Sequence, residues 1–497
     1  MNCLLSLDIG TTSVKGVLFD PSGGALASAS QEYQLHKPSA DIVELDPQLY
    51  WQAVCEVVGM LLKDSKQAAS EISAVGVTSQ GETLIVLDKS GQPIMPAIVW
   101  LDSRSQAQAD TIARTFGPDE VYRVTGQQEI IPVWTATRML WLKENRPDLF
   151  ARARWFMLVG DYILYRLTGQ VRSDVGLSAS TMYLDITTGR WWDQMLRFLG
   201  VGPDRLPQVM ASGSVIGEVS AEAAGQTHLA AGTAVVCTPM DQICGAVGAG
   251  NLDGGIITEN TGAALAISAI VDRPTYDPQK RVGMFMHAIA GKYVLLPWIA
   301  TAGMALRWFR DEFGGGLDYT RLCQEANQVP PGAEGLMFLP YLCGAGCPDM
   351  DSRVRGVFWR IDLGHRRGHF VRAILESVAF VLRRNIQMLG ELGVEAREVR
   401  CLGGAARDDL WVSIKADMLN VPCLTMETDE STALGVAMLA AVGAGIYPDL
   451  ASAGKAMVRV RRRIEPDPQR ASAYEQVYNH YCSLHQWASE LMSQKGL

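Results

Sequence analysis

The sequence lacks the features by which several classes of protein are recognised. Its ten cysteines include no CxxC pair, which argues against a zinc or disulfide framework and for free thiols in a reducing compartment. No segment reaches the ~20 apolar residues of a membrane span, and the notable charge-free stretch, residues 431–448, is rich in Gly and Ala. The N-terminus has no basic region, and Asp8 interrupts its apolar residues, so no secretory signal is predicted. These absences predict a cytoplasmic protein with no membrane partner.

Positive charge is also scarce. The chain has 44 Lys and Arg against 53 Asp and Glu, and a protein this acidic binds a phosphate backbone poorly. No nucleic acid partner is therefore predicted, and the basic run at residues 459–463 is interpreted as an edge strand with solvated charges. The composition is otherwise globular, with 48% hydrophobic residues, and 497 residues suffice for two large domains or three smaller ones.

The common nucleotide-binding and catalytic motifs are missing as well. The sequence contains no GxxxxGK[ST] phosphate loop, and residues 245–250 do not fit GxGxxG. His365 and His369 are four residues apart but lack the Glu of HExxH, and no GxSxG nucleophile motif occurs. The chemistry of this protein must therefore come from less general patterns.

A similar order of predicted elements occurs twice along the chain. The first copy is predicted as strands at 3–9, 14–19 and 25–35, a helix from Pro47 capped by Asp46, and strands at 72–77 and 84–87. The second is predicted as strands at 255–259 and 263–271 around a turn, a helix over 369–392 and a strand at 399–402. This order indicates two α/β domains of similar plan, with a boundary near 245–255.

The turn after the first strand is a candidate phosphate site. Asp8 comes near the strand end and is followed by Gly10 and three hydroxyl residues, Thr11, Thr12 and Ser13. Gly10 allows close approach of an anion to the backbone, the hydroxyls and N–H groups supply donors, and Lys15 adds positive charge. Asp8 is suited to hold Mg²⁺ against those phosphates. The alternative is an ordinary polar hairpin turn.

Two later segments are also candidates. Asp241 and Gln242 stand between a strand at 234–237 and a helix, where an Asp either acts chemically or only caps the helix. Gly403, Gly404 and Ala405 lie between a strand and a helix, where a flat base or ribose can approach the backbone. Their alternative is a simple turn.

These segments belong to an ordered series of motifs that covers essentially the whole chain. The series comprises DIGTTSVKGVLFD at 8–20, VELDPQLYW at 43–51, GVTSQGETLIVLD at 76–88, PAIVWLDSR at 96–104, TATRMLWLKEN at 135–145, GDYILYRLTG at 160–169, PMDQICGAVGAG at 239–250, TAGMALRWFRDEF at 301–313, RGVFWRIDLG at 355–364, LGGAARDDLW at 402–411 and STALGVAMLAA at 431–441. In this order the motifs resemble the FGGY carbohydrate kinases, the family of glycerol kinase, xylulokinase and gluconokinase.

The resemblance implies a fold and a set of roles. The fold is α/β, with two ribonuclease-H-like domains of the actin/hexokinase-like ATPase type, here residues 1–248 and 249–497, around a cleft. The implied cofactors are ATP and Mg²⁺. By resemblance Asp241 is the catalytic base and Asp8 the Mg²⁺ partner. Phosphates and adenosine are assigned to the Gly10–Ser13 loop with Lys15, and to Thr261, Gly262, Gly303, Gly403, Gly404 and Ala405.

The substrate side departs from the known patterns of the family. Gln80 and Glu82 match the segment that bonds sugar hydroxyls, and Trp100 matches an aromatic residue that packs on the carbon face of the sugar. Gln242, the partner of Asp241 in the family's Asp-Gln pair, is a further substrate-binding candidate. Gly81 stands where glycerol kinases have Arg, and the Met-His of xylulokinases is absent. Elsewhere Ala345-Gly346 replaces a Glu-Arg pair, Arg360 replaces a Gly, and Arg138 replaces the usual Lys. Such changes redirect specificity without removing a catalytic group.

The predicted function is therefore an ATP-dependent kinase of a small sugar or polyol, with a ketopentose as the leading substrate. A glycerol, tetritol or gluconate kinase is the alternative within the family. The rivals outside it are a non-catalytic sugar sensor with the same fold, and an actin- or chaperone-like ATPase. A homodimer is left open.

Overall fold

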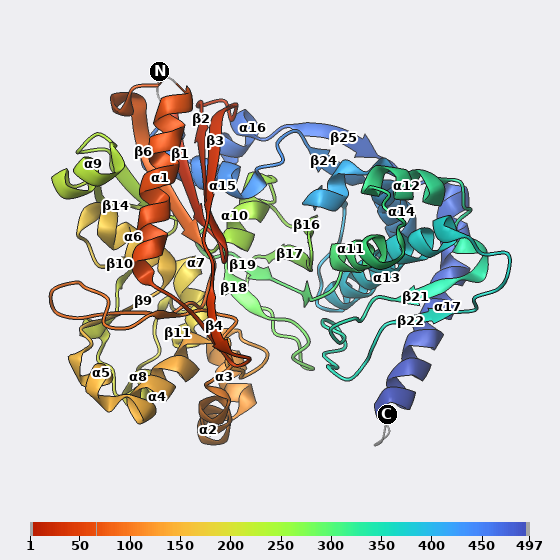
Figure 1. Cartoon of the computed structure of the whole chain (residues 1–497), viewed down its shortest axis with the longest axis horizontal. Coiled ribbons are helices and arrows are strands. Elements are labelled where there is room, and N and C mark those ends of the chain that lie inside the picture. Colours follow the sequence, from red (N-terminus) through yellow and green to blue (C-terminus); the bar gives the residue numbers. More distant parts are fainter. Residues whose placement is uncertain (1–2, 66, 494–497) are drawn as a thin grey trace.

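The computed structural model describes residues 3–65 and 67–493, which fold into two lobes, each built around a mixed β-sheet (Figure 1). Within these residues the first sheet has the order β14-β15-β6-β1-β2-β3 and the second the order β18-β19-β17-β16-β23-β24-β25, with β20 paired to β17. The strands of the first sheet are β1 (Cys3–Ile9), β2 (Ser13–Phe19), β3 (Ala25–Glu32), β6 (Ile72–Ser79), β14 (Val215–Glu218) and β15 (Ala234–Cys237). Those of the second are β16 (Ile256–Thr261), β17 (Leu265–Val271), β18 (Met284–Met286), β19 (Tyr293–Leu295), β20 (Trp298–Ile299), β23 (Glu398–Leu402), β24 (Cys423–Met426) and β25 (Val460–Ile464).

The two sheets share one plan of strand directions, which confirms the predicted duplication. In the first, β1, β6 and β15 run parallel, β1 pairs antiparallel with β2, and β14 closes the far side antiparallel to β15. In the second, β16, β23 and β24 run parallel, β16 pairs antiparallel with β17, and β25 closes the sheet antiparallel to β24. In both sheets the turn after the first strand of the repeat therefore lies beside the carboxyl end of a parallel neighbour.

Helices and short strands surround these sheets. The helices of the first lobe are α1 (Pro47–Ser65), α2 (Gln106–Phe116), α3 (Pro118–Thr125), α4 (Thr135–Asn145), α5 (Pro147–Arg152), α6 (Val159–Thr168), α7 (Val175–Ser178), α8 (Asp193–Leu199), α9 (Ala221–Thr227) and α10 (Asp241–Gly248). Those that follow are α11 (Gly303–Phe313), α12 (Tyr319–Asn327), α13 (Arg367–Glu391), α14 (Asp409–Leu419), α15 (Ser431–Gly443), α16 (Leu450–Met457) and α17 (Pro468–Ser493). The small sheets are β4 (His36–Ser39) with β5 (Ile42–Leu45) and β8 (Ala97–Ile98), β7 (Ile85–Leu87) with β9 (Trp155–Met157), β10 (Arg172–Asp174) with β13 (Gln208–Met210), β11 (Leu184–Asp185) with β12 (Arg190–Trp191), and β21 (Met337–Leu339) with β22 (Val357–Trp359).

Strand β1 shows why the first sheet is covered on both faces. Successive side chains of a strand point to opposite faces, so an apolar strand without alternation needs a partner layer on each side. Leu5 and Leu7 pack in a core with α1 and α6, whereas Leu4 packs in a separate core with α15. Helix α1 begins as predicted, since the Asp46 Oδ1 accepts a hydrogen bond from the Gln48 N–H at 2.9 Å.

Helix α15 joins the two lobes, and glycine makes the contact possible. A Cβ on Gly435 would lie 1.9 Å from the Cys244 carbonyl oxygen of α10, and one on Gly248 would lie 1.8 Å from that of Ser431. This close approach explains the Gly- and Ala-rich stretch at 431–448 as a helix–helix interface. In the part of the chain that the structure describes, no helix is long and apolar enough to cross a membrane. The division at 248/249 stays a prediction.

The C-terminal elements also follow the sequence pattern. Helix α17 forms where the aromatic stripe predicted it. Its side chains Tyr474, Tyr478 and Tyr481 are buried, whereas Trp487 is exposed. The basic run forms β25 at the edge of the second sheet, as expected for solvated charges.

Candidate active site

The parallel strands of the first sheet bring three of the predicted site residues to one edge. The register pairs Ile9 of β1 with Ser79 of β6, and Val77 of β6 with Cys237 of β15. Asp8 near the end of β1, Gln80 just after β6 and Asp241 at the start of α10 therefore lie at the same carboxyl edge. The Gln80 N–H donates to the Ile9 carbonyl at 2.9 Å, which holds this residue against β1. Residues far apart in sequence thus meet where open α/β sheets bind their ligands.

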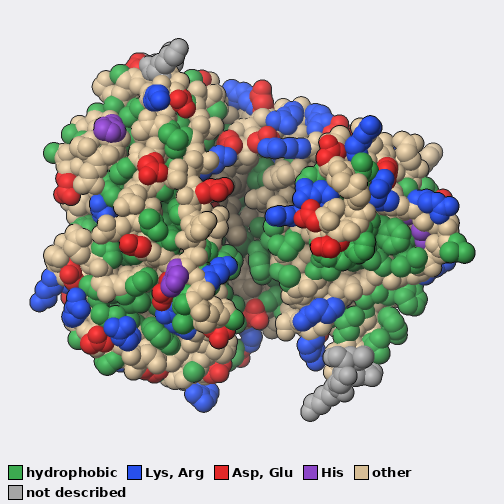
Figure 2. Space-filling view, viewed as in Figure 1, with side chains coloured by type: hydrophobic (Ala, Val, Ile, Leu, Met, Phe, Trp, Pro, Cys, Tyr) green, Lys and Arg blue, Asp and Glu red, His purple; other side chains and the backbone are tan. Residues whose placement is uncertain are grey.

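A cavity of about 400 Å³ opens at this edge, between the lobes. Figure 2 shows the cleft that separates the lobes on this face of the molecule. Five predicted substrate and catalytic residues line the cavity: Gln80, Glu82, Trp100, Asp241 and Gln242. Thr11 of the predicted phosphate loop lines it too, so the loop and the candidate base face one space. This is the volume of a small-molecule site.

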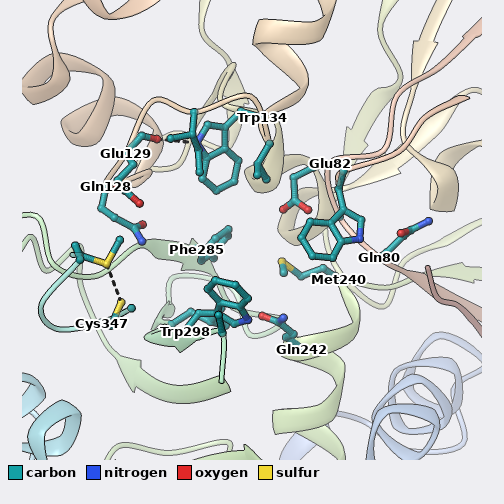
Figure 3. Close-up of a pocket in the computed structure, with 18 of the residues that line it drawn as sticks. Gln80, Glu82, Gln128, Glu129, Trp134, Met240, Gln242, Phe285, Trp298 and Cys347 are labelled. Carbon is teal, nitrogen blue, oxygen red and sulfur yellow. Dashed lines mark hydrogen bonds between the residues drawn. The ribbon is translucent and has the colours of Figure 1, made fainter. Parts of the chain in front are cut away.

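The part of the cavity wall that sequence patterns do not predict includes several aromatic and sulfur-containing side chains. Trp134 lies on one side and Trp298 of the second lobe on the other, with Phe285 between them (Figure 3). Gln128, Glu129 and Cys347 also belong to this part of the lining. Trp134 directly precedes the TATRM motif, which is a local signal, whereas Phe285 and Trp298 stand in short strands without a motif.

Three carboxyl groups interact in this region. Burial raises the pKa of Asp241 to about 6. Burial and the negative charge of Asp241 raise the pKa of Asp8 to about 8. Burial and the same charge also raise the pKa of Glu82 to about 8, although the nearby Arg138 guanidinium opposes the shift. Such displaced values are typical of functional sites.

Polar atoms of the site residues also have unused bonding capacity. Among the described residues, Asp8 Oδ1, Gln80 Oε1 and Gln242 Oε1 are buried without a hydrogen-bond partner in the protein. Buried polar atoms are nearly always paired, so each of these oxygens is suited to accept from a ligand or to bind a cation. The amide nitrogen of Gln80, in contrast, is paired: Nε2 donates to the Tyr50 hydroxyl at 3.1 Å, which fixes the orientation of the amide group.

The predicted phosphate loop is a closed hairpin turn. The Gly10 N–H donates to the Ser13 carbonyl at 2.9 Å, and the Thr11 hydroxyl accepts from the Trp100 indole N–H at 2.9 Å. Lys15 lies opposite Asp8 in the register of β1 and β2, and its ammonium pairs with Glu430 at 2.5 Å. Glu430 therefore offsets the positive charge of Lys15, the residue that the sequence predicts to attract phosphate.

A metal site here would rest on few protein ligands. No group of three or more His, Cys, Asp or Glu side chains in residues 3–65 and 67–493 is placed to hold a metal ion. Mg²⁺, however, is usually held by one or two carboxylates together with substrate phosphates and water. Asp8, with its unpartnered Oδ1 beside the phosphate loop, fits that kind of site.

The predicted nucleotide residues gather at the corresponding edge of the second sheet. Thr261 ends β16 and Gly403 follows β23, its parallel neighbour. The Gly303 N–H at the start of α11 donates to the Gly262 carbonyl at 3.0 Å, and a Cβ on Gly303 would lie 2.3 Å from that oxygen. Gly403 has a positive φ of 75°, and its Cβ would lie 2.7 Å from the Thr261 carbonyl, so both positions require glycine.

A buried charged group supports this hairpin, and sequence patterns do not reveal it. Lys415 of α14 donates to Glu259 Oε1 at 2.6 Å and to the Thr261 hydroxyl at 3.0 Å, and neither the Lys nor the Glu side chain is exposed. The Thr261 hydroxyl donates its single proton to Glu259. It therefore has no donor left for a phosphate oxygen, and the Gly262 N–H is itself bonded within the turn, to the Ala264 carbonyl at 3.0 Å.

Two lobes of one strand order, a cleft between them, and turns at strand ends on both sides define the actin/hexokinase-like fold. The chain belongs to the FGGY family of carbohydrate kinases: the N-terminal domain of that family matches residues 3–248 and the C-terminal domain matches residues 267–444. It is therefore a sugar kinase that uses ATP as phosphate donor.

Known proteins are similar over nearly the whole length. The xylulose kinase of Bacillus subtilis is 30% identical over 491 residues, 99% of this chain and 98% of that protein. The gluconokinase of the same organism is 29% identical over 454 residues, 89% of this chain and 88% of that protein. The ligand-bound crystal structure of xylulose kinase from Lactobacillus acidophilus matches with a TM-score of 0.92 at 26% identity, covering 98% of this chain and 99% of that one.

Proposed function

We propose that this kinase transfers the γ-phosphate of ATP to a hydroxyl of a small uncharged sugar, with a ketopentose as its substrate. The observation that carries this proposal is the charge of the cavity. The acidic residues that line the cavity are Glu82, Glu129 and Asp241. Among the described residues, no Lys, Arg or His lines it. Similarity to the xylulose kinase of Bacillus subtilis supports the same substrate class.

The charge of the cavity argues against the gluconate alternative. A substrate carboxylate would be placed among carboxyl groups with no cationic side chain in the lining to pair with it, and an unpaired buried charge is costly. A neutral sugar instead offers hydroxyls to the oxygens of Gln80 and Gln242, and its C–H face to Trp100 or Trp298. Glycerol and tetritols remain the alternative, since they are neutral as well.

In the proposed mechanism Asp241 is the general base. A sugar hydroxyl is a poor nucleophile at neutral pH, and a positioned carboxylate accepts its proton as the bond to phosphorus forms. The Asp241 Oδ1 accepts from the Gln242 N–H at 2.7 Å, which orients the carboxyl at the start of α10. The side chains around it hold the sugar and exclude water, since most catalysis of phosphoryl transfer is positioning and charge neutralisation.

The donor side is assigned to both lobes. The Gly10–Ser13 loop with Lys15 and the turn at Thr261-Gly262 would hold the phosphates, and Gly303 and Gly403–Ala405 the adenosine. A second cavity, of about 800 Å³, adjoins this last loop, since Arg407 and Asp408 line it. Asp8 would hold Mg²⁺, whose chemistry here is to neutralise charge on the phosphate oxygens.

The experiment that tests the substrate is ADP release, measured by a coupled assay, across ketopentoses, glycerol, erythritol and gluconate. We expect the best ketopentose to exceed gluconate in kcat/KM by at least about 100-fold, because a site of the wrong polarity rejects its ligand strongly. Gluconate as the preferred substrate would refute the neutral-sugar assignment. No response to any sugar would favour the sensor, and ADP release without sugar the ATPase.

The pKa of Asp241 predicts the pH dependence. Because this pKa is raised to about 6, the carboxylate that accepts the proton is lost as the pH falls through 6. We expect kcat/KM for the sugar, at saturating ATP and Mg²⁺, to fall about tenfold per pH unit below that value. The Glu82→Gln variant should keep this acidic limb, whereas a flat profile between pH 5 and 7 would contradict the assignment.

We also propose a cytoplasmic location. Cys237, Cys244, Cys401 and Cys423 are buried as free thiols, which suits a reducing compartment. The homodimer stays a prediction.

A further inference from the structure

Arg138, on α4, is a fully buried cation directly behind the proposed sugar site. It is 0% exposed, and its guanidinium donates hydrogen bonds to backbone carbonyls and to no carboxylate of the described residues. Burying a guanidinium is costly unless its donors are satisfied, and here both terminal nitrogens are bonded while Nε has no partner among the described residues. Burial lowers the pKa of Arg138 only to about 10, so it stays charged at neutral pH.

The carbonyls that Arg138 contacts belong to two separate loops of the sugar site. Its Nη1 donates to the Glu82 carbonyl at 2.6 Å, in the loop between β6 and β7. Its Nη2 donates to the Trp100 carbonyl at 2.7 Å and to that of Asp102 at 3.4 Å, in the loop after β8. Glu82 and Trp100 both line the cavity, so one side chain connects two of its walls from behind.

The backbone of the first loop needs such support. Glu82 has a φ of 56°, in the left-handed region that a non-glycine residue adopts only at a cost. Its carbonyl also accepts from the Thr135 hydroxyl at 3.1 Å, so α4 directs two donors at this one peptide. The Glu82 loop and the Trp100 loop are also joined at one end, where Leu84 and Ile98 exchange two backbone hydrogen bonds at 3.0 Å. Arg138 joins the same two loops at a second place, through the carbonyls of Glu82 and Trp100.

We propose that Arg138 is a positioning residue that sets the separation of the Glu82 and Trp100 side chains, and thereby the affinity for sugar. A planar guanidinium offers two donor groups in a fixed fork, whereas the ammonium of Lys is a single point charge. Arg138→Lys therefore retains the charge but gives up the fixed link between the loops. The inference rests on the proposed sugar site, and it concerns binding rather than the chemical step.

The test is steady-state kinetics with both substrates on Arg138→Lys and Arg138→Met. We expect Arg138→Lys to raise the KM for sugar about tenfold, the effect of losing a hydrogen bond to a charged group, while the KM for ATP changes less than about twofold. Direct titration of the sugar by calorimetry should show the same loss of affinity. Arg138→Met should show at least as large an effect.

Arg205→Lys is the matched control. Arg205 likewise donates to two backbone carbonyls, of Phe150 and Ala153, both at 2.7 Å, but it does not line the cavity. The Arg205→Lys variant should leave the KM for sugar and the KM for ATP unchanged. An unaltered sugar KM in Arg138→Lys, or equal losses for sugar and ATP that follow a lower melting temperature, would overturn the inference. If the wild type phosphorylates no sugar, the proposed function fails instead.

Discussion

Asp241→Asn is expected to lower kcat by at least about 100-fold, the smallest effect typical for the loss of a general base. The amide keeps the size and polarity of the carboxyl group but does not accept the proton of the sugar hydroxyl. Asp241 lines the cavity, and its carboxyl accepts a hydrogen bond from the backbone N–H of the neighbouring Gln242. Melting temperature and nucleotide binding should therefore change little, and rapid-quench and steady-state assays of ADP release measure the effect.

Asp193→Asn provides the control for Asp241→Asn. Asp193 is the first residue of α8 as Asp241 is of α10, but it is exposed and does not line the cavity. Its replacement should leave kcat unchanged. An Asp241→Asn enzyme with wild-type turnover would remove Asp241 from the mechanism, whatever the sugar.

Lys415→Met is expected to have the largest effect on stability. The change removes the cation that pairs with Glu259 at 2.6 Å and leaves that carboxylate buried in the second sheet. Loss of one partner of a buried ion pair costs about 3–5 kcal/mol. For a domain of this size that corresponds to a fall in melting temperature of roughly 6–20 °C, which calorimetry measures.

A double replacement separates the charge from the shape of this group. In Lys415→Met with Glu259→Gln no unpaired carboxylate remains, so much of the lost stability should return. Stability equal to wild type in the single variant, or a double variant less stable than the sum of the single changes, would contradict the ion-pair explanation. Thr261, which is assigned to phosphate binding, also accepts a hydrogen bond from Lys415. The KM for ATP should therefore rise in the Lys415→Met variant.

Much of the fold was predictable because its signals are local. The hairpin at Gly10–Ser13 closes through a hydrogen bond across three residues, and the start of α1 depends on one capping side chain. The amphipathic pattern of residues 369–392 and the aromatic stripe of the C-terminus correspond to α13 and α17. The predicted substrate residues Gln80, Glu82 and Trp100 follow from an ordered series of motifs, and the structure brings them into one cavity.

The remaining parts of the site depend on contacts that no local pattern encodes. Lys415 and Glu259 are 156 residues apart, and Arg138 meets Glu82 from 56 residues away. Phe285 and Trp298 close the cavity from the other lobe, and their short strands carry no motif. The Thr261 hydroxyl is bonded to Glu259 and to Lys415 of α14, and the motif around Thr261 reveals neither contact.

The amino-acid sequence by itself determined the family, the repeated α/β plan, the turns at the strand ends and the identity of the candidate base, because these depend on neighbouring residues and on motif order. Only the tertiary structure decided which carboxyls share a cavity, how far their pKa values are displaced, and which buried cations support them. Burial and electrostatic interaction depend on how distant segments pack, and a linear pattern does not specify that packing.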